Sequence, residues 1–447
     1  MKSCILIPFA ALCVVFLALD GHADNAPTSL LDAARTLPLE KLKPLLAQSA
    51  NINQKDKDGN TLLMAAAGAG KTETAAYLID HGANVNALAK DGDTALLEAA
   101  HSGNKETISL LLSHNANVSV ADYAGVTPLM EAVHSGNVPS INLILDQKAD
   151  VNTADKDGFT PLMIAAYSGS SPAIATLVGR GAQVNAADKK GHTPLMEAAN
   201  AGSSEALQVL LDHGATVDAS DEDGFTALMV AASNSNQNAL DVLLSHGADV
   251  NNKTKNGFTP LMQAAASGNA INMQLLLSHN ADITATTEKG GTALAIAAYS
   301  NQLGSVRFLL QHGASAMVSD TEGHTPLMGA CFSSNLEMVK LLVQKGVDVN
   351  ATAKDGFTPL MQAAFSGSAD ILTYLLDQGA KLDARTSSGA TPLMQAAYSG
   401  NIDGAKKLLY YGADVLAKDS SGDTALSFAV KHKNDAVADL LKDAGAE

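Results

Sequence analysis

Cysteine and aromatic residues are scarce in this chain. Its 447 residues include three Cys, no Trp and only 4% aromatic residues. Cys4 and Cys13 lie in an apolar N-terminal stretch, so Cys331 is alone in the remainder and has no partner for an internal disulfide. No His or cationic residue stands next to Cys331 to activate a thiolate. We therefore expect a buried, unreactive thiol, and a disulfide-stabilised scaffold is excluded.

An excess of basic residues is also lacking. The chain has 29 Lys and Arg against 46 Asp and Glu, which gives a formal net charge of −17. An acidic protein repels phosphate backbones, so we expect no nucleic-acid partner.

Long apolar runs are missing except at the N-terminus. One run extends over residues 4–19, after Lys2 and before Gly21-His22-Ala23, and it predicts a secretory signal peptide over residues 1–23. A membrane anchor is the alternative, but the run is short for a bilayer span. We expect an exported protein with no membrane contact after cleavage. The lack of disulfides favours a bacterial periplasm, with the extracellular space as the other location.

The chain contains a strict repeat of 33 residues. Each unit has a Gly followed two residues later by Thr, from Gly59 and Thr61 to Gly422 and Thr424. The glycines are Gly59, Gly92, Gly125, Gly158, Gly191, Gly224, Gly257, Gly290, Gly323, Gly356, Gly389 and Gly422. A period of this length indicates one supersecondary unit stacked many times, in which each unit buries its apolar face against its neighbours.

One unit can be interpreted in physical terms. Gly356 suits a tight turn, Thr358 suits a helix N-cap, and Pro359 suits the first helical position. Apolar residues at helical spacing predict a short first helix, and a second helix is predicted over residues 369–377. Gly379 suits the left-handed residue that ends this helix, and an extended return leads to the next turn.

These units resemble the ankyrin repeat. The resemblance rests on residues 157–166 (DGFTPLMIAA) and 247–251 (GADVN), and it covers the chain from Thr28 onward. It implies an all-α ankyrin-repeat solenoid, built from helix-turn-helix units with a β-turn or hairpin finger. The organisation that we predict is a signal peptide (1–23), a truncated N-terminal capping repeat (24–55), eleven ankyrin repeats (56–418) and a C-terminal capping repeat (419–447).

One departure from the ankyrin pattern is systematic. The family usually carries His after Thr-Pro-Leu, where it shares a hydrogen bond with Thr, whereas nine units here carry Met. These are Met64, Met130, Met163, Met196, Met229, Met262, Met328, Met361 and Met394. This departure puts the Thr–His hydrogen bond in doubt. The fixed place of Met in the repeat indicates a core layer and not a cofactor site.

No motif for catalysis, a cofactor or a metal stands out. Residues 68–72 (GAGKT) mimic part of a phosphate-binding loop, but Ala65 occupies the place of a required Gly, and the segment falls at an inter-helix turn. Six His recur one repeat apart, which is too far for a shared zinc ion, and we expect them near the last carbonyls of the second helices. They are His81, His114, His213, His246, His279 and His312. We expect no enzymatic activity, no cofactor and no metal.

Aromatic residues concentrate in two variable places of the unit. The first place lies between Gly and Thr, and the second follows the Ala-Ala pair; the ankyrin resemblance implies that both face the concave groove. The first holds Phe159, Phe225, Phe258 and Phe357, and the second holds Tyr167, Tyr299, Phe332, Phe365 and Tyr398. Large exposed patches mark interaction sites. The alternative is that the rings stack between repeats and only stiffen the solenoid.

The function that we expect is non-enzymatic binding of a partner protein by an exported monomer, through the groove and the turn tips. Ankyrin resemblance implies protein–protein recognition without naming the partner. Within this class the protein would be an inhibitor of an enzyme or toxin, an immunity-type protein or a host-directed effector. A rigid spacer of the cell envelope is the alternative from a different class.

Overall fold

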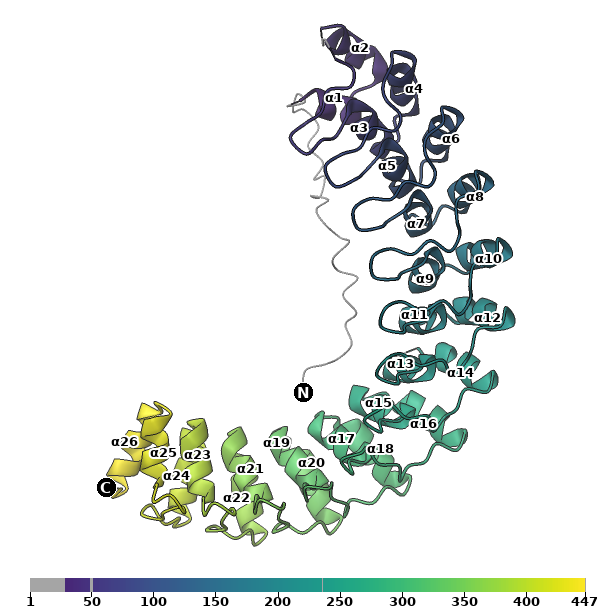
Figure 1. Cartoon of the computed structure of the whole chain (residues 1–447). Helices are drawn as coiled ribbons and strands as arrows, with labels where there is room; N and C mark the ends of the chain where they lie inside the picture. Colours follow the sequence, from purple (N-terminus) through teal and green to yellow (C-terminus); the bar gives the residue numbers. More distant parts are fainter. Residues whose placement is uncertain (1–28, 49–50, 235, 447) are drawn as a thin grey trace. The chain divides into compact units, whose positions relative to one another are not determined.

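The computed structural model describes residues 29–48, 51–234 and 236–446, and the predicted signal peptide lies outside them. The described residues form 26 α-helices and no β-strand (Figure 1). The chain divides into two compact units, up to Ala149 and from Asp150 onward. None of the described helices has the length and apolar character needed to cross a bilayer.

Short helices come in pairs in both units. The first unit contains α1 (Leu30–Thr36), α2 (Leu39–Ala47), α3 (Leu62–Gly68), α4 (Thr72–Asp80), α5 (Ala95–His101), α6 (Lys105–Ser113), α7 (Pro128–His134) and α8 (Val138–Asp146). The second unit contains α9 (Pro161–Tyr167), α10 (Ser171–Gly179), α11 (Pro194–Ala201), α12 (Ser204–Asp212), α13 (Ala227–Ser233), α14 (Gln237–Ser245), α15 (Pro260–Ser267), α16 (Ala270–Ser278), α17 (Ala293–Tyr299), α18 (Leu303–Gln311), α19 (Pro326–Phe332), α20 (Leu336–Gln344), α21 (Pro359–Ser366), α22 (Ala369–Asp377), α23 (Pro392–Ser399), α24 (Ile402–Tyr410), α25 (Ala425–Lys431) and α26 (Asp435–Asp443).

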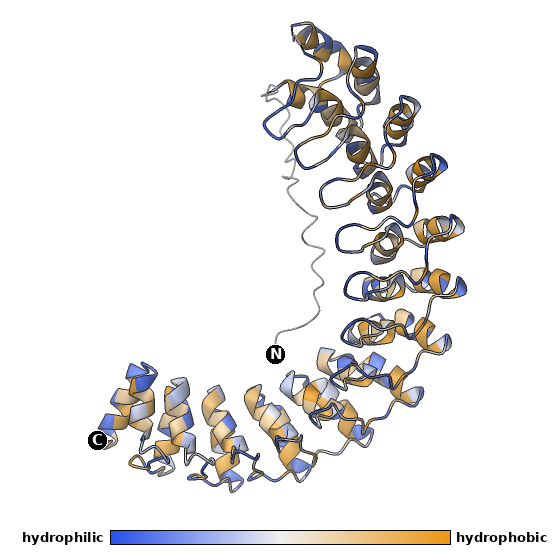
Figure 2. Ribbon diagram, viewed as in Figure 1, coloured by the Kyte–Doolittle hydropathy of each residue, from blue (hydrophilic) through white to orange (hydrophobic). Residues whose placement is uncertain are grey.

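Each unit has two layers of helices. Within each unit, odd-numbered helices pack on the next odd-numbered helix, even-numbered helices from α4 onward pack on the next even-numbered one, and the two helices of each pair pack together. Apolar residues concentrate on the helices and hydrophilic residues on the connecting loops (Figure 2). The all-α solenoid of helix pairs is therefore confirmed, and the predicted helix over residues 369–377 coincides with α22.

The first helix of a pair begins as its sequence predicts. At α9 the Thr160 hydroxyl accepts a hydrogen bond from the Met163 backbone N–H (3.3 Å), and Pro161 takes the first helical position. This bond satisfies one of the amides that a helix N-terminus leaves without a partner. The Thr cap recurs from α3 to α25, and Pro follows it in the repeats that carry Thr-Pro, so these residues fix where the first helix of each of these pairs starts.

Methionine takes the place of the family's His in the core. The nine Met side chains are at most 3% exposed, which confirms the prediction of a core layer. In four units the Met or Ser side chain at this place also accepts from the Thr backbone N–H. The Sδ of Met64 lies 3.3 Å from the Thr61 nitrogen, and that of Met394 lies 3.3 Å from the Thr391 nitrogen. The thioether thus serves both as apolar filling and as a weak acceptor.

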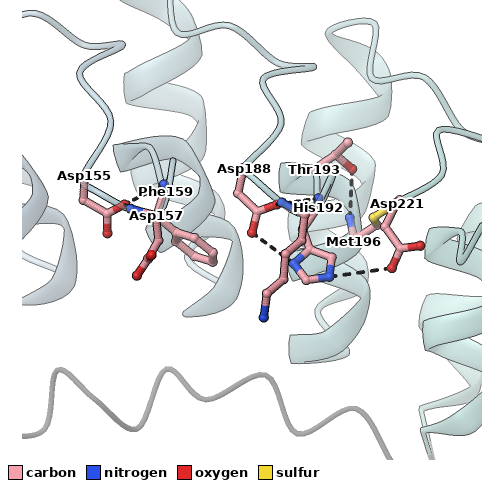
Figure 3. A network of polar contacts seen from close by, with 9 residues as sticks. Asp155, Asp157, Phe159, Asp188, His192, Thr193, Met196 and Asp221 are labelled. Atoms are coloured by element: carbon pink, nitrogen blue, oxygen red, sulfur yellow. Dashed lines mark hydrogen bonds and ion pairs between the residues drawn. The ribbon is translucent and has the colours of Figure 1, made fainter. Parts of the chain in front are cut away.

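A turn joins each second helix to the next first helix, and it forms the finger of the repeat. In the finger before α9, the Asp155 carboxylate accepts from the backbone N–H groups of Asp157 and Phe159 (2.9 and 2.8 Å; Figure 3). Neighbouring fingers are joined by one backbone bond, as from the Lys189 N–H to the Asp157 carbonyl (3.1 Å). Only isolated antiparallel bridges occur in the described fingers, at Lys55–Thr61, Ser220–Thr226 and Thr286–Thr292.

The repeated Gly has two reasons to be Gly. Gly158 has a φ of +93°, a conformation that other residues rarely adopt. A Cβ at this residue would also lie 3.0 Å from Asp188 Cα and 3.0 Å from the Lys189 nitrogen of the next finger. The glycine therefore permits both the turn and the close approach of successive fingers.

Cys331 lies on α19 and is fully buried, as the sequence predicts. Burial raises the pKa of its thiol well above the ordinary range, because a thiolate loses its hydration there.

Candidate functional site

The first aromatic place of the unit lies at the base of the finger. Phe159 is only 5% exposed, and Phe225, Phe258 and Phe357 are half-buried. The expectation that the first place presents exposed rings to a groove is therefore wrong for Phe159. Asp155 holds the Phe159 backbone, because its carboxylate accepts from the Phe159 N–H and its own N–H donates to the Phe159 carbonyl (2.9 Å). Asp221 makes the same bonds to the half-buried Phe225, so burial of the ring at this place differs between repeats that share the same backbone bonds.

The second aromatic place is exposed. It lies at or one residue before the C-terminal end of the first helix of a pair, on α9, α17, α19, α21 and α23. The side chains there are 37–51% exposed, and they are Tyr167, Tyr299, Phe332, Phe365 and Tyr398. Four of them occupy consecutive repeats, and we call Tyr299, Phe332, Phe365 and Tyr398 the aromatic row. Tyr167 is separated from this row because Asn200, Ser233 and Ala266 occupy the second place between them.

Rings in the aromatic row contact their neighbours but are not covered by them. The ring centroids of Tyr299 and Phe332 are 6.0 Å apart and tilted, and those of Phe365 and Tyr398 are 6.0 Å apart and stacked. Such pairs contribute about 0.5–1.5 kcal/mol beyond their buried area. More than a third of each side chain still faces solvent. Stacking between repeats therefore accounts for only part of the surface of each ring.

The row extends at one end to residues that the sequence analysis missed. The Tyr398 ring centroid lies 4.2 Å from that of His432 and 6.4 Å from that of Phe428. His432 follows α25 and Phe428 lies within it, so they belong to the last repeat. The period of the repeat, carried one unit further from Tyr398, gives Lys431, so the second place gave no signal for Phe428 or His432.

Tyr299 illustrates how the row is seated. A Cβ at Gly329 on α19 would lie only 2.9 Å from Tyr299 Cδ2, so a larger residue there would have to displace this ring. Burial, with smaller contributions from Asp320 and Cys331, raises the pKa of Tyr299 to about 12. Its hydroxyl therefore stays protonated at neutral pH and is available as a hydrogen-bond donor.

In the first compact unit the second place holds histidines. His101 on α5 and His134 on α7 stack with ring centroids 5.9 Å apart, and His101 Nδ1 lies 2.7 Å from Glu131 Oε2 on α7. At the first place of the same repeat, burial and the neighbouring carboxylates of Asp91, Glu98, Asp122 and Glu131 raise the pKa of Asp93 to about 7. The second place thus carries imidazole rings on α5 and α7, and Tyr or Phe in the aromatic row.

His192 is the one histidine at the first place that is buried, and it lies between two carboxylates (Figure 3). Its Nδ1 is 3.0 Å from Asp188 Oδ2 on its own finger, and its Nε2 is 3.6 Å from Asp221 Oδ2 on the next finger. Both Asp side chains are nearly buried. This arrangement joins two fingers by charge when the imidazole is protonated.

The six recurrent histidines have the structural role that their position predicts. In each of them Nδ1 lies 2.7–3.0 Å from the carbonyl oxygen four residues earlier, in the last turn of the second helix. Among the residues whose placement is described, no group of three or more His, Cys, Asp or Glu could hold a metal ion. The GAGKT segment joins the end of α3 to the start of α4, as expected for an ordinary inter-helix turn.

Comparison with known protein families gives one result that covers the repeats. A model of three ankyrin repeats matches the chain six times, at residues 30–122, 119–188, 162–254, 246–320, 312–386 and 383–447. No curated protein matches the chain.

Proposed function

Because this chain belongs to the ankyrin-repeat family, whose repeats generally mediate protein–protein interaction, we propose that it is a non-enzymatic scaffold that binds a partner protein along the aromatic row. The observation that carries this proposal is the presence of four partly exposed rings in four consecutive repeats. Interface centres are enriched in Tyr and Phe, which supply large contact areas at a small entropic cost.

Exposure of the rings favours binding over simple stacking. A ring whose only role is to stiffen the solenoid gains most when it is fully covered, as the Leu and Met side chains of the core are. The row instead leaves apolar surface in water, which a partner can cover. Asn200 and Ser233 occupy the second place in other repeats of the same compact unit, so the fold itself does not require an aromatic residue there.

Export is a further part of the proposal. Lys2, the apolar run over residues 4–19 and the small residues Gly21 and Ala23 support a cleaved leader. In that setting the partner would be an envelope enzyme, a toxin or a host protein. The rival hypothesis is a rigid spacer of the cell envelope that binds nothing through its rings.

A fourfold substitution tests the binding proposal. In a variant with Tyr299, Phe332, Phe365 and Tyr398 changed to Ala, we expect capture of the partner from the native envelope fraction to be lost. Each substitution of a partly exposed side chain should cost only about 0.5 kcal/mol in folding free energy, with a further loss where rings touch.

Two matched variants make the result interpretable. Tyr410→Ala removes an 83% exposed ring on α24, outside the row, and should leave capture unchanged. Leu360→Ala removes a buried side chain and should cost about 2–5 kcal/mol in folding free energy while the row is chemically intact. Unfolding of the fourfold variant as severe as that of Leu360→Ala would support the spacer, and normal capture by a folded fourfold variant would place the partner elsewhere.

A further inference from the structure

Glu197 is a buried acid without a compensating partner. It lies on α11, its side chain is 0% exposed, and neither carboxylate oxygen has a hydrogen-bond partner among the described residues. The same place of the repeat holds Ile164 on α9 and Val230 on α13, the two helices that pack against α11. An acid therefore stands in a layer where the neighbouring repeats place aliphatic side chains.

The surroundings of Glu197 contain no cation to pair with it. Among the helices packed on α11, α13 has no ionisable residue, α9 has only Tyr167 at its end, and the Glu205 and Asp212 side chains of α12 are exposed. The adjoining fingers carry Asp188, His192 and Asp221, and their tips carry the exposed Lys189, Lys190, Glu222 and Asp223. Burial, and then the negative charge of Asp188, raises the pKa of Glu197 from 4.5 to about 7.

His192 in the same repeat is engaged by carboxylates other than that of Glu197. Its Nδ1 lies 3.0 Å from Asp188 Oδ2, and its Nε2 lies 3.6 Å from Asp221 Oδ2 on the next finger. The imidazole therefore lies between the two fingers on either side of α11, and neither oxygen of Glu197 bonds to it.

From this geometry we propose that α11 forms a proton-responsive packing element within the second unit. At mildly acidic pH, Glu197 is a neutral acid that fits the apolar layer. At neutral to alkaline pH the ionised carboxylate requires water, so α11 opens locally. This property is independent of the aromatic row and of what it binds.

The direction in which pH changes the packing of α11 follows from the linkage between proton binding and folding. A carboxyl group whose pKa is higher in the folded state than in the open state stabilises the folded state most below its ordinary pKa of 4.5. That stabilisation is lost as the pH rises through the folded-state pKa of about 7. The packing of α11 should therefore weaken mainly between pH 4.5 and pH 7.

Hydrogen–deuterium exchange of the full chain at pH 5 and pH 8 tests the proposal, with labelling times scaled for the intrinsic exchange rate. Amides of residues 194–201 should lose protection on the order of 50-fold between these pH values, as follows from the shift of the Glu197 pKa to about 7. In Glu197→Gln the loss should shrink at least tenfold. Glutamine occupies this place as Gln263, Gln362 and Gln395, so the repeat accommodates it.

Two further variants complete the test. Glu131→Gln changes the acid at the same place on α7, which is paired with His101, and should leave exchange at α11 unaltered. Glu197→Ile copies Ile164 and should be as insensitive to pH as the glutamine variant, so a failure of one variant to fold leaves the other to decide. Equal pH dependence of α11 in the natural chain and in either folded Glu197 variant would overturn the proposal.

Discussion

At the scale of single residues, each repeated residue has an identifiable physical role. Thr160 caps a helix through its hydroxyl, Met163 fills the layer beneath it, and Gly158 allows the next finger to approach. The same residue recurs at one place in most repeats because that place has similar neighbours in each of them. Variation is confined to places such as that of Glu197, where side chains of different chemistry are accommodated.

Two glycines allow the roles of conformation and close approach to be separated. Gly422→Ala forces Ala into a φ of +82° with nothing within 4 Å of its Cβ, so it should cost about 1–2 kcal/mol in folding free energy. Gly158→Ala adds a 3.0 Å approach to the Asp188 backbone and should cost about 3 kcal/mol or more. Urea unfolding followed by circular dichroism measures both. Equal costs would show that finger contact is not what requires the glycine.

At the scale of helices and fingers, the sequence was sufficient to predict the architecture. Thr-Pro at the N-cap, Gly after the second helix and apolar residues at helical spacing predicted helix pairs, and α22 has the bounds that were predicted for it. This success has a physical basis, because caps and turns depend on residues close in sequence and the period repeats the same local signal.

The candidate site could be predicted only in part. The second aromatic place was identified from its pattern, and the structure finds all five of its rings exposed. The expectation of an exposed ring is wrong for Phe159, because burial at the first place differs between repeats that share the same finger hydrogen bonds, and the residue type alone does not reveal it. Glu197 and His192 gave no signal, because their burial is set by helices and fingers of neighbouring repeats and not by their own sequence context.

At the scale of the whole molecule, the protein is an acidic repeat protein for which we propose an N-terminal leader peptide. The N-terminal residues suggest export, and the prediction is an intact mass that corresponds to a chain beginning at Asp24 when the protein is made with its own leader. Mass spectrometry of the protein from the envelope fraction provides the measurement. A full-length mass in a membrane pellet would favour the N-terminal anchor.

Photo-crosslinking from within the aromatic row tests whether a partner protein binds there. A photoreactive phenylalanine analogue would replace Phe365, which is 38% exposed and lies in the row, and in a separate protein Tyr410, which is 83% exposed and lies outside it. Irradiation in the native cell envelope should give a discrete protein adduct from position 365 and none from position 410. An adduct from position 410 alone, or none from position 365 in a folded protein, would contradict the account.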